Sequence, residues 1–137
     1  MACIRKEFVI EADADAVWAA IRDVGAVHRR LVPGVVVATR LEPGARVVTF
    51  ANGMVVRELI VDLDDEARRL AYAAVEGGRA THHHATLQVF DAGHGRARIV
   101  WVTDVVPDEV AGPVRALVEQ GAAAMKATLE RREGGGG

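Results

Sequence analysis

Apolar and polar residues alternate along the first stretch of the chain, from Cys3 to Glu11. Ile4, Phe8 and Ile10 recur at mostly even spacing, which predicts a β-strand with one apolar face, because successive side chains of a strand point to opposite sides. After Asp13, a residue type that favours helix N-caps, the apolar spacing becomes helical. The sequence therefore predicts a helix between Asp13 and Gly25, whose apolar residues share one side: Ala16, Val17, Ala20, Ile21 and Val24.

A second, short helix is expected from Val27 to Leu31, because Pro33 disfavours helical geometry in the residue before it. Beyond this point the chain contains six β-rich stretches, which turn residues separate. Among these turns, Asn52-Gly53 predicts a hairpin with a type I′ turn, in which both central residues have positive φ. The pattern predicts an antiparallel meander of six strands: Val35–Leu41, Arg46–Ala51, Met54–Asp62, Arg69–Glu76, Ala80–Asp91 and Arg96–Val105.

The apolar spacing becomes helical again after Pro107. Pro113 is expected to be the first residue of the last and longest helix, a position at which proline is favoured. The glycines from Gly134 to Gly137 have no side chains to bury, and we expect them to form a disordered tail. One stripe of the helix is apolar or small: Val114, Leu117, Val118, Gly121, Ala122, Met125 and Leu129.

The composition is that of a globular protein and argues against several classes of function. The chain has 137 residues, 50% of them hydrophobic and 26% charged, which is typical of one domain, expected over residues 1–133. The net charge is −2 with basic and acidic residues interspersed, so no nucleic-acid partner is expected. Apolar runs are too short to span a membrane, and Arg5, Lys6 and Glu7 stand where a signal peptide would be apolar. We therefore expect a cytoplasmic protein without membrane insertion, as a monomer or a weak homodimer.

Three groups of residues carry a resemblance to a known family. They are Ile10-Glu11-Ala12 with Ala16-Val17-Trp18, Arg57-Glu58-Leu59-Ile60 leading to Leu63-Asp64-Asp65-Glu66, and Arg98-Ile99-Val100-Trp101 before Pro107. Together with the order of elements, they resemble the polyketide cyclase/dehydrase branch of the START/Bet v 1-like (SRPBCC) superfamily over about residues 3–131. The resemblance implies an α+β helix-grip fold, in which a curved antiparallel sheet of about seven strands wraps around a long C-terminal helix, with two short helices after the first strand. It also implies a ligand cavity between the sheet and that helix.

The segment from Glu58 to Gly78 also resembles the plant abscisic acid receptors. In those receptors a strand glutamate precedes a Leu-Asp-Asp-Glu turn, here Leu63-Asp64-Asp65-Glu66, and a Gly-Gly loop, here Gly77-Gly78, closes the pocket. The resemblance implies that Glu58 faces the cavity, where the matching acid of the receptors holds ligand through water. The gate loop of the receptors is replaced by the tight Asn52-Gly53 hairpin, so the resemblance does not imply hormone reception.

Alternation along the strands predicts which side chains face the last helix. His83, Ala85 and Leu87 form a more apolar set than His82 and His84, so His83 is expected inside. Both faces of the strand that contains Glu58 are apolar, and only the resemblance places Glu58 inside. The ligand-binding residues are expected on these faces, on the last strand and on the last helix: Val56, Ile60, Ala85, Leu87, Ile99, Trp101, Leu117, Gly121 and Met125.

Glu58 and His83 are the candidate catalytic residues, because both are expected on the same concave face. A carboxylate and an imidazole in one cavity can act as an acid/base pair near neutral pH. The second interpretation is that Glu58 forms an ion pair with an arginine of a neighbouring strand, Arg46 or Arg69, while His83 bonds a core hydroxyl. A buried carboxylate must be paired or neutralised in either case, so the sequence leaves both interpretations open.

Two further groups of polar residues have alternative interpretations. His82 and His84 could share a metal ion, but no cysteine or carboxylate at suitable spacing completes a site, so we expect solvated side chains, no metal and no cofactor. The run His28-Arg29-Arg30 is expected at the cavity mouth, either as an attraction for an anionic ligand group or as an ordinary helix surface.

Trp18 and Trp101 are each either core residues or ligand platforms, and Trp101 is the better ligand candidate. Cys3 has no second cysteine with which to form a disulfide. Its position at the start of a strand predicts a packing residue rather than a catalytic thiol.

These residues and the resemblance predict a protein that binds a hydrophobic or aromatic small molecule. One version adds polyketide cyclase, aromatase or dehydratase chemistry, in which the cavity folds a poly-β-ketone while Glu58 as base and His83 as acid move protons. An alternative is a non-catalytic carrier or sensor of a lipid-like or aromatic metabolite. A third is a protein-interaction module, which a large exposed apolar patch would support.

Overall fold

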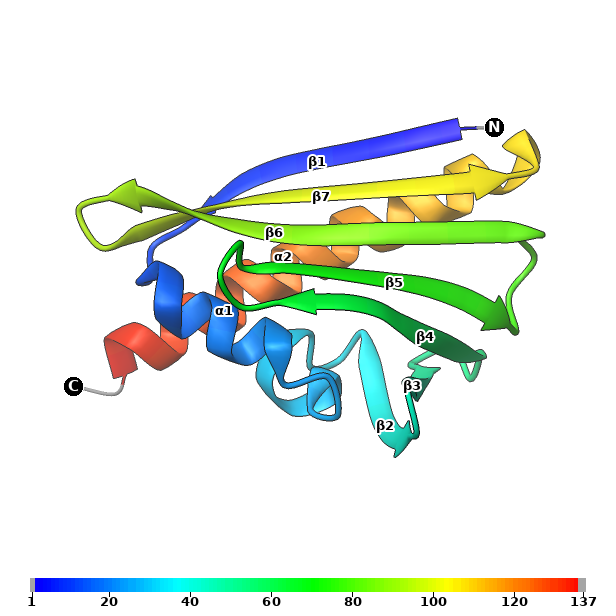
Figure 1. The fold of residues 1–137 in the computed structure, drawn as a ribbon, viewed down its shortest axis with the longest axis horizontal. Coiled ribbons are helices and arrows are strands. Elements are labelled where there is room, and N and C mark those ends of the chain that lie inside the picture. The colour runs from blue at the N-terminus through cyan, green and yellow to red at the C-terminus, as the bar shows by residue number, and fades with distance from the viewer. Residues whose placement is uncertain (1, 136–137) are drawn as a thin grey trace.

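The computed structural model describes residues 2–135, with side chains up to residue 131. A sheet of seven strands and a long C-terminal helix make up most of it (Figure 1). No helix in this described part is both long enough and apolar enough to cross a membrane. The elements in chain order are β1 (Ala2–Ile10), α1 (Ala14–Arg22), η1 (Val27–Leu31), β2 (Val36–Glu42), β3 (Ala45–Phe50), β4 (Val55–Asp64), β5 (Arg69–Glu76), β6 (His82–Gly93), β7 (Arg96–Val106), η2 (Asp108–Val110) and α2 (Ala111–Gly135).

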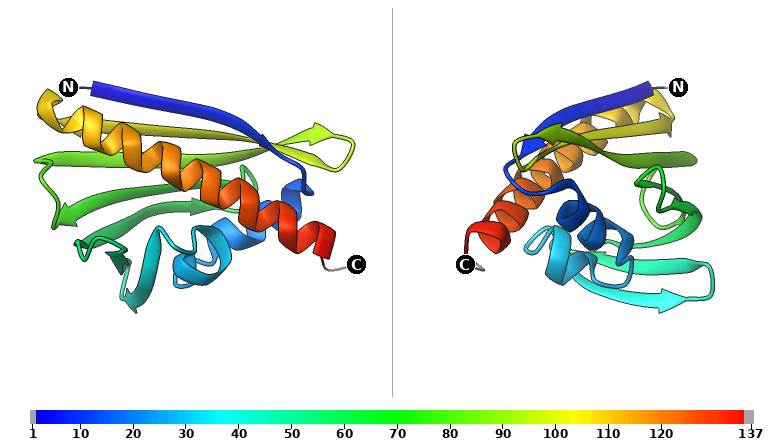
Figure 2. Two further views of the ribbon diagram at one scale, coloured as in Figure 1. Left: turned by 180° about the vertical axis from the view of Figure 1, so that it is seen from behind. Right: turned by 60° about the vertical axis from the view of Figure 1, so that its left-hand side comes forward.

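The strands form one antiparallel sheet in the order β1-β7-β6-β5-β4-β3-β2. The six later strands are a meander, as the turn spacing predicts, and β1 pairs with β7 at the opposite edge. Helix α2 runs diagonally across one face of this curved sheet (Figure 2). This arrangement of an open curved sheet and a long helix is the expected helix-grip fold.

The first helix begins and packs as its pattern predicts, but it ends early. Asp13 is the N-cap, and its carboxylate accepts a hydrogen bond from the backbone N–H of Asp15 at 3.2 Å. The helix ends at Arg22, ahead of the expected stop at Gly25. A Cβ at Gly25 would lie 2.9 Å from the side chain of Leu41, which is exposed and free to move aside.

Two expectations about turns and helix starts are wrong. Asn52 does not have the positive φ that a type I′ turn requires, whereas Gly53 does, at 90°. The N–H of Gly53 donates to the carbonyl of Phe50, and the N–H of Phe50 donates to the carbonyl of Met54, so the loop has three residues, a type I turn followed by a left-handed glycine. Pro113 is not the first residue of α2, since the helix begins at Ala111 after the 3₁₀ turn η2.

The end of α2 also differs from the expectation. The helix includes Gly134 and Gly135, which the sequence placed in a disordered tail. The rest of that expected tail, residues 136 and 137, lies outside the described residues.

The concave face of the sheet carries two separate apolar clusters. The larger one joins α1 to the sheet and to the end of α2, and it includes Val17, Ile21, Val89, Ile99 and Leu129. The smaller one lies at the other end of β1 and β7, around the beginning of α2, and consists of Ile4, Val105, Val110 and Val118. Along β7, residues 101 and 103 therefore lie between the two clusters, and this is where the cavity described below is found.

Candidate functional site

A cavity of about 340 Å³ lies between the sheet and α2. Its walls come from η1 and the loop after it, from the concave faces of β3 to β7, from the loop between β5 and β6, and from η2 and α2. Eight of the residues expected at the site line it: Val56, Glu58, His83, Leu87, Trp101, Leu117, Gly121 and Met125.

Three expected ligand-binding residues do not line the cavity. Ile99 is fully buried in the larger apolar cluster, two residues along β7 from the cavity residue Trp101. Ala85 is also fully buried, and its cross-strand neighbours are Tyr72 and Thr103. Ile60 is half-buried against the same cluster. Alternation placed Ala85 and Ile99 on the inner face, and the resemblance that placed Glu58 inside placed Ile60 on the same face. The position along the strand decides which of these inner side chains reach the cavity.

Arg46 and Glu58 form a buried ion pair on the cavity wall. They are directly opposite each other on β3 and β4, and the Nε of Arg46 donates to Oε1 of Glu58 at 2.8 Å. Their side chains are only 5% and 11% exposed. The guanidinium of Arg46 also lies over the ring of Tyr72, 5.0 Å from its centroid. Of the two arginines named by the second interpretation of Glu58, Arg46 is therefore its partner, whereas Arg69 lies 3.7 Å from Asp62.

Tyr72 adds a polar atom to the same wall. The indole Nε1 of Trp101 donates to the hydroxyl of Tyr72 at 3.2 Å. Burial, together with the nearby carboxylate of Glu58, raises the pKa of the Tyr72 phenol above its usual value. The hydroxyl therefore keeps its proton at neutral pH and, with Trp101 as its donor, has that proton left to give to a ligand.

The ring of Trp101 packs closely against α2 at a glycine. A Cβ at Gly121 would lie 2.9 Å from Cη2 of the Trp101 ring, whereas a Cβ at Gly112 would have no neighbour within 4 Å. We expect Gly121→Ala to displace the ring and to forfeit the roughly 0.5–1 kcal/mol that alanine gains over glycine in a helix. Gly112→Ala should lack this penalty, and thermal unfolding with tryptophan emission would compare the two variants. Equal behaviour of both would mean that the ring moves freely.

His83 is half-buried and lines the cavity together with Glu58. Burial lowers the pKa of its imidazole from 6.5, the carboxylate of Glu58 opposes this shift, and His82 and His84 add to it. The neutral imidazole is therefore the main form at pH 7.

The lowered pKa of His83 makes stability depend on pH. Because the unfolded chain binds a proton at this site more readily than the folded one, stability should fall as pH falls below about 6.5 and should level off below the folded pKa. His83→Gln should flatten this part of the curve in urea unfolding between pH 7.5 and 5. His82→Gln, on the exposed side of the same strand, should leave it unchanged, and an equal effect of both would contradict the assignment.

Residues 1–132 match the family model described as polyketide cyclase/dehydrase and lipid transport. The chain belongs to this family. No curated protein matches it. Solved structures with the same fold include a protein of Bacillus thuringiensis, with a TM-score of 0.84, 18% identity and coverage of 93% of this chain and 98% of that one.

Two further structures are similar to this family member. One is a protein of Thermobifida fusca, with a TM-score of 0.79, 27% identity, and coverage of 98% and 94% of the two chains. The other is norcoclaurine synthase from Thalictrum flavum in complex with dopamine and hydroxybenzaldehyde, with a TM-score of 0.71, 23% identity, and coverage of 92% and 84%. Norcoclaurine synthase has a Bet v 1-like fold, which agrees with the superfamily that the sequence motifs indicate.

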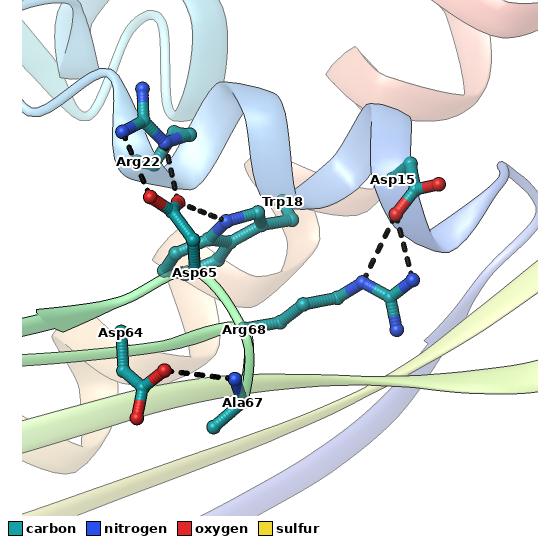
Figure 3. A network of polar contacts seen from close by, with 7 residues as sticks. All are labelled: Asp15, Trp18, Arg22, Asp64, Asp65, Ala67 and Arg68. Carbon is teal, nitrogen blue, oxygen red and sulfur yellow. Dashed lines mark hydrogen bonds and ion pairs between the residues drawn. The ribbon is translucent and has the colours of Figure 1, made fainter.

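Outside the cavity, the Leu-Asp-Asp-Glu turn of this family member ties the sheet to α1 (Figure 3). Asp65 accepts a hydrogen bond from the indole Nε1 of Trp18 at 2.8 Å and from Nε of Arg22 at 2.7 Å. Arg68, after the turn, donates to Asp15 at 2.7 Å. Trp18 is buried among core residues, so it is a core residue with a polar anchor rather than a ligand platform.

The Asp65 anchor should contribute to stability in a pH-dependent way. Hydrogen bonds from Arg22 and Trp18 lower the pKa of the Asp65 carboxyl below 3.8. A group with a lowered folded pKa stabilises above its unfolded pKa and loses that effect as pH falls through the folded one. Asp65→Asn should therefore lower the Tm at pH 7, and the difference should shrink below pH 3.8. Asp64→Asn, which keeps an acceptor for the N–H of Ala67, is the matched control.

The other candidate groups lie away from the cavity. His82 is exposed, and His84 is half-buried opposite Asp104 on β7. Among the described residues, no group of three or more His, Cys, Asp or Glu is arranged to hold a metal ion. Cys3 is exposed, and its hydrogen bond to Asp104 raises the pKa of its thiol.

The basic run on η1 does not line the cavity, although Val27 and Leu31 on the same turn do. His28 lies 3.0 Å from the hydroxyl of Thr39, and Arg30 donates to Asp23 at 2.9 Å. These contacts fit the interpretation of this run as an ordinary helix surface.

Several lining residues were not expected from the sequence. Tyr72 was missed because β5 carries small or apolar residues on both faces, so its pattern selects no inner side. Arg46 was considered only as a partner for Glu58. Arg79 lies on the loop between β5 and β6, beside Gly77 and Gly78, and no periodicity marks a loop residue.

Proposed function

We propose that this family member binds one small, ring-containing, largely apolar molecule in the cavity between the sheet and α2. The observation that carries the proposal is the cavity itself, with about 340 Å³ of space and mainly aliphatic and aromatic walls. An engineered cavity of about 150 Å³ holds benzene, so this volume is sufficient for two or three rings. Ligand pockets of proteins begin at about this size.

A few polar groups on one wall would orient the molecule. Glu58, Arg46 and the hydroxyl of Tyr72 all come from adjacent strands and meet the cavity on the sheet side. Pockets for small molecules combine such apolar walls with a small number of convergent polar groups. The similar structure of norcoclaurine synthase holds two small aromatic molecules, dopamine and hydroxybenzaldehyde, which supports a molecule of this class.

Native mass spectrometry with a panel of aromatic polyketides, flavonoids and sterol-like compounds tests the proposal. We expect retention of one ring-containing compound per chain. Leu117→Trp places an indole in the cavity and should abolish retention. Arg115→Trp adds the same group to an exposed position of the same helix that does not line the cavity, and should leave retention intact. Retention by neither wild type nor the Arg115 variant would refute the proposal.

A second candidate function is acid/base chemistry on the bound molecule, of the cyclase, aromatase or dehydratase type. It is favoured by the presence of His83, with its lowered pKa, in the same cavity as Glu58. A neutral imidazole suits a base better than an acid, so His83 would take a proton from a carbon next to a carbonyl group. The phenol of Tyr72 would donate to the carbonyl oxygen as its negative charge develops.

The same mass spectra separate this chemistry from a carrier or sensor. Loss of water or ring closure in the retained compound would support an enzyme, and His83→Gln and Tyr72→Phe should then abolish the change without abolishing retention. Recovery of the unchanged compound from every incubation would favour a carrier or sensor.

A further inference from the structure

The charged side chains that line the cavity do not balance. Among the described residues, they are Arg46 and Arg79 on the positive side and Glu58 on the negative side. His83 adds no charge at pH 7, because burial lowers its pKa. The cavity lining therefore carries a net charge of +1, which one anionic group on a ligand would neutralise.

The guanidinium of Arg46 is only partly used by the protein. Its Nε is bonded to Glu58, but its Nη1 is buried and makes no hydrogen bond within the described part of the chain. A buried charged donor without an acceptor is costly, and Arg46 as a whole is only 4% exposed. Because Arg46 lines the cavity, a turn of its guanidinium would bring this donor to an oxygen atom of a bound molecule.

Arg79 provides a second positive charge, at the rim. It is exposed, it follows the Gly77-Gly78 loop, and it forms no ion pair among the residues that the structure describes. A charge at the opening of an apolar cavity attracts anions and raises their rate of association.

We infer that the molecule bound here is a monocarboxylic acid, with its carboxylate on the guanidinium of Arg46 and its rings against the apolar walls. This inference rests on the proposed function and adds the chemical class of the ligand. A planar guanidinium is suited to a carboxylate, and two oxygens match its fork of donors. A dianionic phosphate would exceed the single positive charge of the lining, and a neutral carbonyl compound would leave that charge unbalanced.

Glu58 has an opposing effect in this arrangement. Its carboxylate holds Arg46 in position through Nε, but it also repels a second carboxylate on the same guanidinium. Removal of its charge should therefore strengthen the binding of an acid. If the cavity were built for a cation or for a donor group, removal of the Glu58 charge would weaken binding instead, so the sign of this effect separates the two cases.

Calorimetric titration with matched compounds tests the inference. The probes are 2-naphthoic acid and biphenyl-4-carboxylic acid, each with its methyl ester and its primary amide. At pH 7 we expect each acid to bind roughly 10- to 100-fold more tightly than its ester or amide, as the loss of a charged hydrogen bond requires. Equal binding of acid and ester would overturn the inference and leave the proposed function intact. Binding of none of the six compounds would count against both.

Variants test whether Arg46 causes the preference for acids. Glu58→Gln should tighten the binding of the acids and leave the esters unchanged. Arg46→Gln combined with Glu58→Gln avoids an unpaired buried charge and should remove the preference for acids. Arg79→Gln should weaken the acids by a smaller factor, mainly through slower association. A preference for acids that survives the double variant would overturn the assignment to Arg46.

Discussion

Arg46→Met is expected to destabilise the protein strongly, by about 3–5 kcal/mol, because it leaves the carboxylate of Glu58 buried without a partner. Glu58 has a side chain that is 11% exposed, and the Nε of Arg46, at 2.8 Å, is the hydrogen-bond donor to it. The substitution also removes the cation above the ring of Tyr72. Urea unfolding at pH 7 measures the loss.

Two controls separate the pairing of Arg46 from its packing. Arg46→Met combined with Glu58→Leu removes both charges, and such replacements are often close to neutral, so the double variant should regain most of the loss. Arg69→Met removes an arginine of a neighbouring strand whose contact with Asp62, at 3.7 Å, is exposed, and should cost much less. If the single and double variants were equally unstable, packing of the Arg46 side chain rather than its charge would explain the effect.

The same pair shows how far the sequence could define the site. Alternation along β6 and β7 placed His83, Leu87 and Trp101 on the inner face, where they line the cavity. On β4 both faces are apolar, and Glu58 was placed inside by the family resemblance alone. The register that sets Arg46 opposite Glu58 depends on the β3–β4 turn, which alternation does not fix.

That turn illustrates the limit of local signals. Asn52-Gly53 is compatible with a two-residue and a three-residue loop, and the two differ by one residue in the register of the strands they connect. The observed pairing of Thr49 with Val55 requires the three-residue loop, in which the side chain of Asn52 accepts from the N–H of Met54 at 2.9 Å. Hydrogen bonding between strands decides this, not the dipeptide.

Contacts between segments far apart in the chain could not be predicted from the sequence, for a different reason. The indole of Trp18 bonds Asp65, which is 47 positions away, and no periodicity links a helix residue to a turn residue. The resemblance singled out the Leu-Asp-Asp-Glu turn only as a motif. In the fold it holds α1 on the sheet, so the motif has a structural role in addition to any role near the cavity.

Gly77→Ala is expected to be the most disruptive single change at the cavity rim, with a loss of at least about 3 kcal/mol. Gly77 has φ of 86°, a value that L-residues avoid, and a Cβ there would lie 2.0 Å from the carbonyl oxygen of Val55. No side-chain movement relieves a contact with backbone, so the loop would have to separate from the start of β4. Thermal or urea unfolding measures the loss.

Comparison with Gly78→Ala separates the cost of the contact between Gly77 and Val55 from the cost of a positive φ. Gly78 has a similar positive φ of 72°, but a Cβ there would have no neighbour within 4 Å, so only the conformational cost of about 1–2 kcal/mol is expected. Both glycines line the cavity, so both variants also report on ligand binding. If Gly77→Ala cost no more than Gly78→Ala, the rim would have moved away from Val55 at little cost. A rim that moves so easily would open the cavity between the β5–β6 loop and β4. Ligands would then enter the cavity at this point.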